Sequence, residues 1–230
     1  MSLIISVYVP TGIVISGDSR TTIKLRQESN SDNKSKESET SVVLSDASTK
    51  VSLLFCRFGV GAFGSAIIND LPVAHHLEQF EIKHADSPSK TTDQLGKDLL
   101  TYFRKITPIP SVNFVVAGYD GHTPWVLSID VADNSSKRVN IDQANGEVSY
   151  GILRGGNTEV VDRLLCDPKS NPLFRVMNLQ DAVDYSRHLI RSTIDQLRFE
   201  PRFPTVGGPI DTLIVTPSEV KFLVNKDVHC

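Results

Sequence analysis

Hydrophobic positions begin almost at the first residue of this chain and follow two different periods along it. Residues 3–9 and 13–16 are rich in β-branched side chains and flank Pro10-Thr11-Gly12, which predicts two strands joined by a tight turn. A buried strand so close to a terminus is unusual, because termini fray unless something holds them. Either Ser2 simply begins an edge strand, or the terminus is needed at a fixed place.

The rest of the pattern predicts further strands and four helices. Strands are expected at 51–56, 58–62, 112–117, 124–129, 148–152, 212–216 and 220–224. Apolar residues at helical spacing predict helices at 65–84, 92–106, 158–166 and 179–199. Residues 26–41 have no apolar period and predict a solvated polar loop, which is best interpreted as the tip of a hairpin without a functional role.

The order of these elements is strands, two helices, strands, two helices, strands. Helices that cluster in pairs argue against a doubly wound parallel sheet and favour an α+β fold with two antiparallel sheets, each covered by a helix pair. No internal repeat or linker divides the sequence. We therefore expect a single domain over 1–230, with the polar loop at about 26–41 as an insertion.

Composition and charge narrow the function classes. The chain has 230 residues, of which 40% are hydrophobic and 22% charged, and its net charge of −3 favours neither nucleic acid nor a membrane surface as partner. Its apolar runs are too short to span a bilayer, and no signal peptide is evident. The three cysteines are widely spaced, so no disulfide framework or zinc site is indicated, and we expect a cytoplasmic protein with no cofactor.

Four segments, in this order, resemble the proteasome-type branch of the N-terminal nucleophile hydrolases and its bacterial relatives. They are TGIVISGDSRTT, STKVSLLF followed by GVGAFGSA, FVVAGYDG and VGGPIDTLIV. The resemblance covers most of the chain. It implies a four-layer α-β-β-α sandwich of two antiparallel sheets, the family's fold, and association into homo-oligomers.

The spacing of single residues also fits this family. Its catalytic Asp lies sixteen positions after the N-terminal nucleophile, as Asp18 lies after Ser2. Its catalytic Lys lies fourteen positions before the Gly whose N–H forms the oxyanion site, as Lys50 lies before Gly64. The resemblance therefore implies catalytic roles for these four residues and a supporting role beside Asp18 for Arg20.

Removal of Met1, which a small second residue such as Ser permits, would leave Ser2 with nucleophile and base on one residue. Its hydroxyl would attack, and its α-amine, with an ordinary pKa of about 7.7–8.0, would take the proton. The positive charge of Lys50 would favour the neutral amine, Asp18 would hold Lys50, and the Gly64 N–H would face the developing oxyanion. This predicts hydrolysis of a peptide or small amide.

The same registers imply a substrate pocket of small, mostly polar side chains, which is poorly suited to a large apolar group. Its expected residues are Thr21, Thr22, Ser48, Ser52, Ala62 and Ala66.

Other interpretations remain open. Taken singly, Ser2, Asp18 and Lys50 could be an ordinary strand, turn and surface residue, which would leave a non-catalytic, proteasome-like subunit acting in assembly or binding. His75-His76 is a weak metal candidate because adjacent helical residues face different directions. Residues 154–157 could form a phosphate-binding nest, or a plain loop in which Asn157 caps a helix.

Overall fold

The computed structural model describes residues 2–31 and 34–226, which include two five-stranded antiparallel sheets. The first sheet has the order β12 (Gly151–Gly156), β1 (Leu3–Val9), β2 (Gly12–Asp18), β13 (Ile210–Val215) and β14 (Val220–Val224). The second has the order β11 (Ser135–Arg138), β10 (Thr123–Asp130), β9 (Val112–Asp120), β6 (Phe58–Gly64) and β5 (Val51–Leu54).

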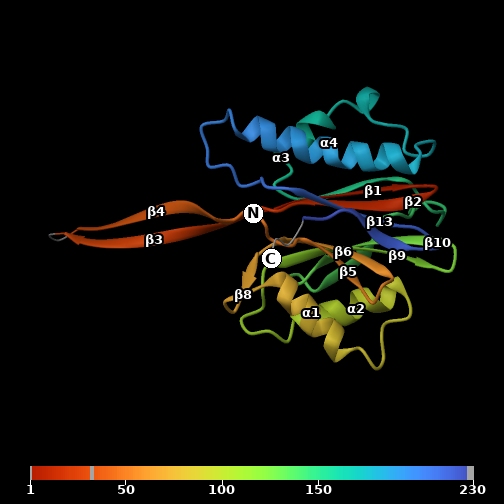
Figure 1. Cartoon of the computed structure of the whole chain (residues 1–230), viewed down its shortest axis with the longest axis horizontal. Helices are drawn as coiled ribbons and strands as arrows, with labels where there is room; N and C mark the ends of the chain where they lie inside the picture. The colour runs from red at the N-terminus through yellow and green to blue at the C-terminus, as the bar shows by residue number, and fades with distance from the viewer. Residues whose placement is uncertain (1, 32–33, 227–230) are drawn as a thin grey trace.

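The two sheets lie face to face with helices on their outer faces (Figure 1). The helices α1 (Val73–Lys83) and α2 (Thr92–Phe103) pack on the second sheet, and α3 (Glu159–Leu164) and α4 (Leu179–Leu197) pack on the first. A short 3₁₀ helix, η1 (Pro168–Ser170), follows α3. The predicted α+β class with antiparallel sheets is therefore confirmed.

Alternation along β1 explains why its apolar run is unbroken. Leu3, Ile5 and Val7 pack against the α3–α4 side, whereas Ile4 and Tyr8 belong to the core between the sheets. All seven residues of β1 are buried, and the strand pairs with β12 on one side and β2 on the other. The interpretation of this segment as an edge strand is therefore wrong, and the residue that precedes it is held at a sheet interior.

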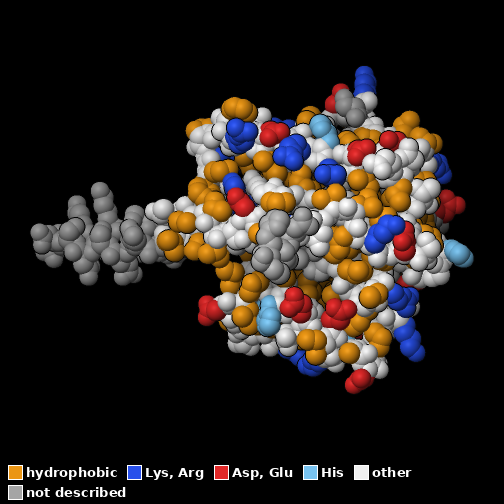
Figure 2. All heavy atoms as spheres, in the orientation of Figure 1, with side chains coloured by type: hydrophobic (Ala, Val, Ile, Leu, Met, Phe, Trp, Pro, Cys, Tyr) orange, Lys and Arg blue, Asp and Glu red, His pale blue; other side chains and the backbone are white. Residues whose placement is uncertain are grey.

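The described residues of 26–41 belong to a hairpin, but they form paired strands rather than the expected loop. They lie in β3 (Thr21–Ser31) and β4 (Lys34–Ser45), an antiparallel ribbon that projects from the body (Figure 1). The ribbon projects away from the two sheets, and a strand outside the core needs no alternation of apolar and polar residues. The sequence pattern therefore does not indicate these strands. Hydrophobic side chains gather at its root in Figure 2, where Leu25, Val42, Val43 and Leu44 are 37–55% exposed.

The helix expected from residue 65 begins only at Val73. Before it, β7 (Ile67–Ile68) and β8 (Leu71–Pro72) form a small hairpin. Its two turn residues, Asn69 and Asp70, have φ of 47° and 64°, the geometry that tight hairpin turns need. Pro72 is the N-cap of α1.

Candidate active site

Four strand ends bring the predicted catalytic residues to one end of the stacked sheets. Ser2 precedes β1, and Asp18 ends β2, its antiparallel neighbour. In the other sheet, Lys50 precedes β5 and Gly64 ends β6, which also pair antiparallel. Antiparallel pairing places the start of one strand beside the end of the next, so each sheet contributes two of these residues at the same end.

Asp18 is the centre of the hydrogen bonding at this end. Its carboxylate is fully buried and accepts from Lys50 Nζ at 2.8 Å. It also accepts from three backbone N–H groups, those of Leu3 at 2.8 Å, Arg20 at 3.2 Å and Gly207 at 3.0 Å. These four donors fix the carboxylate and tie the start of β1, the turn after β2 and the approach to β13 to one point.

Lys50 is a buried cation with two acceptors. Its side chain is 6% exposed, and Nζ donates to Asp18 at 2.8 Å and to the carbonyl oxygen of Arg20 at 2.5 Å. Burial lowers the pKa of Lys50 below its usual 10.5, and the positive charge of Lys226 acts in the same direction, whereas Asp18 opposes both. The site thus holds a charged lysine that loses its proton more readily than a lysine in water.

Ser2 is held by its backbone against β12. The residue is 3% exposed, and its carbonyl oxygen accepts from Asn157 N at 2.7 Å. Gly156, with φ of 93°, passes so close that a Cβ there would lie 1.8 Å from the Ser2 carbonyl oxygen. Asn157 therefore positions Ser2 and does not cap α3, whose N-cap is Thr158. Met1, whose removal the sequence predicts, lies outside the described residues.

The N–H of Gly64 faces the side of β6 on which Lys50 lies. The Ala62 N–H donates across to Lys50 O at 2.8 Å, whereas the Ser65 N–H donates to Ser111 O on the opposite side. Since N–H groups alternate in direction along a strand, that of Gly64 points the same way as that of Ala62. Because β5 begins only at Val51, this N–H lies beyond the paired part of the strand.

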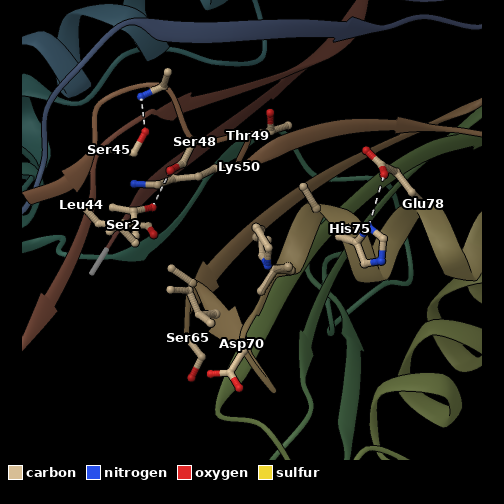
Figure 3. Close-up of a pocket in the computed structure, with 18 residues that line it drawn as sticks. Ser2, Leu44, Ser45, Ser48, Thr49, Lys50, Ser65, Asp70, His75 and Glu78 are labelled. Atoms are coloured by element: carbon tan, nitrogen blue, oxygen red, sulfur yellow. Dashed lines mark hydrogen bonds and ion pairs between the residues drawn. The ribbon is translucent and has the colours of Figure 1, made fainter.

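A cavity of about 530 Å³ opens at this end of the sheets, within the range of small-molecule sites (Figure 3). Ser2 and Lys50 line it, whereas Gly64 itself is not among the lining residues, although its neighbour Ser65 is. Of the six residues predicted for the pocket, four line this cavity: Thr21, Ser48, Ala62 and Ala66. Ser52 lines a smaller neighbouring cavity instead, and Thr22 lines neither of the two.

Arg20 contributes to the site through its backbone. Its N–H donates to Asp18 and its carbonyl accepts from Lys50. Its guanidinium turns away and forms a two-bonded pair with Asp46, at 2.6 and 2.8 Å, and reaches Pro204 O at 3.3 Å. The pKa of the Asp46 carboxyl is lowered, chiefly by this hydrogen bond. Arg20 therefore contacts Asp18 and Lys50 through its main chain, while its side chain pairs with Asp46.

A second buried ion pair adjoins the first. Lys226 Nζ contacts the Asp211 carboxylate and donates to Ser19 Oγ at 3.2 Å, and Lys226 N donates to Asp211 Oδ1 at 3.0 Å. Ser19 N in turn donates to Gly207 O at 3.0 Å. The segment after β14 is therefore joined to the turn that carries Asp18. The sequence carries no local signal for this pair, because its partners lie on distant segments.

One side of the cavity carries charged residues that the sequence pattern does not indicate. Asp70, His75 and Glu78 line it from the β7–β8 turn and from α1 (Figure 3). The nearest sequence signal is the adjacent pair His75-His76, which suggests a weak metal site rather than this arrangement. His75 instead lies 3.8 Å from Glu78, and His76 Nε2 lies 2.9 Å from Ile68 O.

Among residues 2–31 and 34–226, no cluster of histidine, cysteine, aspartate and glutamate side chains could hold a metal ion. No helix in this part of the chain is long and apolar enough to cross a membrane. No protein-family model matches the sequence, and no curated protein matches it either.

Proposed function

We propose that this protein is a proteasome-like N-terminal nucleophile hydrolase that cleaves amide or peptide bonds with Ser2 after removal of Met1. The observation that carries the proposal is the buried Lys50–Asp18 pair in the wall of the cavity that Ser2 lines. The two stacked sheets with a helix pair on each outer face support the corresponding four-layer α-β-β-α sandwich.

The proposed reaction has two steps. In the first, Ser2 Oγ attacks the carbonyl carbon while the α-amine of Ser2 takes the hydroxyl proton. The C–N bond then breaks, the proton passes to the leaving amine, and an ester with Ser2 remains. In the second step the same amine takes a proton from water, which attacks the ester and releases a carboxylic acid, and the proton returns to Ser2 Oγ.

The surrounding residues support each demand of this chemistry. Lys50 lines the same cavity as Ser2. A positive charge there favours the neutral form of the Ser2 α-amine and stabilises negative charge on Ser2 Oγ. The Gly64 N–H faces the Lys50 side of β6, where it is available to a developing oxyanion. Asn157 and Gly156 hold the Ser2 main chain in place, so that the nucleophile is positioned before substrate arrives.

Covalent labelling tests the proposal. Protein shown by intact mass to begin at Ser2 would be treated with a broad electrophilic probe, and the modified residue mapped. We expect labelling of Ser2 and at least a hundredfold loss of the labelling rate in Ser2→Ala and Lys50→Met, each checked for folding by circular dichroism. Ser65→Ala, which changes another serine of the same cavity, is the matched control. Labelling that persists in Ser2→Ala would contradict the assignment of the nucleophile.

A non-catalytic, proteasome-like subunit acting in assembly or binding is the second candidate. The favouring observation is that both acceptors of Lys50 Nζ are Asp18 and the Arg20 carbonyl, with no hydrogen bond to Ser2 Oγ among the described residues. This candidate predicts that protein from the native host retains Met1, that Met1-free protein stays unlabelled, and that the chain sediments as a homo-oligomer. Rapid labelling of Met1-free protein would exclude it.

A further inference from the structure

The cavity has a charged side that the proposed chemistry does not use. Figure 3 places Ser2 and Lys50 on one side of the cavity and Asp70, His75 and Glu78 apart from them, on the side formed by the β7–β8 hairpin and α1. Asp70, His75 and Glu78 come from other segments than Lys50 and Asp18, so their charges add to those of the Lys50–Asp18 pair.

Carboxylates dominate this second side. Asp70 has no ion pair or hydrogen bond with any described residue, and Glu78 meets only His75, at 3.8 Å, an imidazole that is charged only when protonated. Among the described side chains of the lining, the other one that can carry a positive charge is that of Lys50, whose charge is already matched by Asp18 at 2.8 Å. The cavity therefore presents net negative charge to whatever enters it.

Apolar and small residues lie in the same lining as these carboxylates. They are Leu44, Ala47, Ala62, Ala66, Ile67, Pro72, Val73 and Ala74. The imidazole of His75 is the one aromatic ring among the described residues of this lining, so the cavity offers little stacking surface for a flat ligand. Aliphatic lining next to exposed carboxylates suits a side chain with an apolar stem and a cationic head, which is the build of lysine and arginine.

We propose that the cavity selects amide substrates whose side chain ends in a cation, with that head on the side of the cavity that carries Asp70 and Glu78 and its stem along the apolar lining. This inference rests on the proposed function, because it assigns a substrate class to the cavity that contains Ser2. An anionic substrate is disfavoured by the same charges. The Ser2 reaction itself does not depend on them.

Three dipeptide vinyl sulfones that share one reactive group and differ only in carrying an arginine, norleucine or glutamate side chain test the selection. We expect Ser2 of the Met1-free protein to react about two to five times faster with the arginine probe than with the norleucine probe, the size of effect that partly exposed ion pairs give. The glutamate probe should be slowest. In the double variant Asp70→Asn, Glu78→Gln, the ratio of the labelling rates of the arginine and norleucine probes should fall to near one. The control Asp86→Asn removes an exposed carboxylate from a residue outside the cavity lining and should keep the ratio of the parent.

Binding separates this inference from the hydrolase assignment. Argininamide and norleucinamide would be titrated by calorimetry into the parent and the double variant, which requires no reaction. Tighter binding of argininamide that is lost in the double variant supports the cation site, whether or not a probe labels Ser2. The absence of labelling at Ser2 would refute the hydrolase assignment alone. Equal labelling and equal binding of the arginine and norleucine compounds, or a preference that survives in the double variant, would overturn the inference while Ser2 labelling still supports the hydrolase.

Discussion

Replacement of Asp18 by asparagine should be the most damaging single change at this end of the sheets. The carboxylate is fully buried and accepts from Lys50 Nζ and from the backbone N–H groups of Leu3, Arg20 and Gly207. Lys50 Nζ and the Leu3 N–H share Oδ1, and the Arg20 and Gly207 N–H groups share Oδ2, so an asparagine of the same shape keeps one acceptor oxygen but turns an NH₂ group towards two of the four donors. It also leaves Lys50 as a buried cation whose only other acceptor is the Arg20 carbonyl.

Breaking a buried ion pair by removing one partner typically costs about 3–5 kcal/mol, because the other charge stays buried without compensation. Asp18→Asn should reach the upper part of this range, since Lys50 is only 6% exposed and at least one backbone donor also faces an NH₂ group. Lys50→Met should cost less, because the remaining carboxylate still accepts from three backbone N–H groups. The order of the two losses therefore follows from the number of donors around Asp18.

Urea unfolding followed by circular dichroism measures these losses as changes in the free energy of unfolding. Asp86→Asn, which removes an exposed carboxylate, should stay within about 0.5 kcal/mol of the parent. A loss below about 1 kcal/mol for Asp18→Asn would refute the argument from burial. A greater loss for Lys50→Met than for Asp18→Asn would refute the argument from the backbone donors.

Two further predictions concern the Lys50 proton and the backbone beside Ser2. Burial lowers the pKa of Lys50 in the folded protein, so between that lowered pKa and 10.5 the unfolded chain binds more protons than the folded one. The free energy of unfolding of the parent, relative to that of Lys50→Met, should therefore rise with pH across this window. A fall would mean that folding raises the pKa of Lys50. Gly156→Ala should destabilise the fold by more than Gly146→Ala and should slow the labelling of Ser2. Both glycines have positive φ, but only at Gly156 would a Cβ collide with Ser2. Equal losses of the free energy of unfolding in urea would show that the close approach to Ser2 carries no cost.

Several elements are encoded locally and could be predicted without the structure. The uninterrupted β-branched run of β1 and the helical stripe of α4 each carry their own period, because burial on two faces or on one face leaves a repeat in the sequence. The spacing from Ser2 to Asp18 is likewise a property of two adjacent strands, and a two-residue turn joins them. Local patterning was therefore enough to place these residues at one end of a sheet.

Other features depend on contacts between distant segments. The polar β3–β4 ribbon projects from the body, so its sequence shows no alternation of apolar and polar residues that would predict strands. The β7–β8 turn was not predicted because the apolar residues around it also fit helical spacing. Asp70 and Glu78 face the cavity of Ser2 only because the second sheet and α1 stack against the first sheet. The charge of a cavity is a sum over segments that meet only on folding, so tertiary structure alone decided which side chains a substrate would encounter.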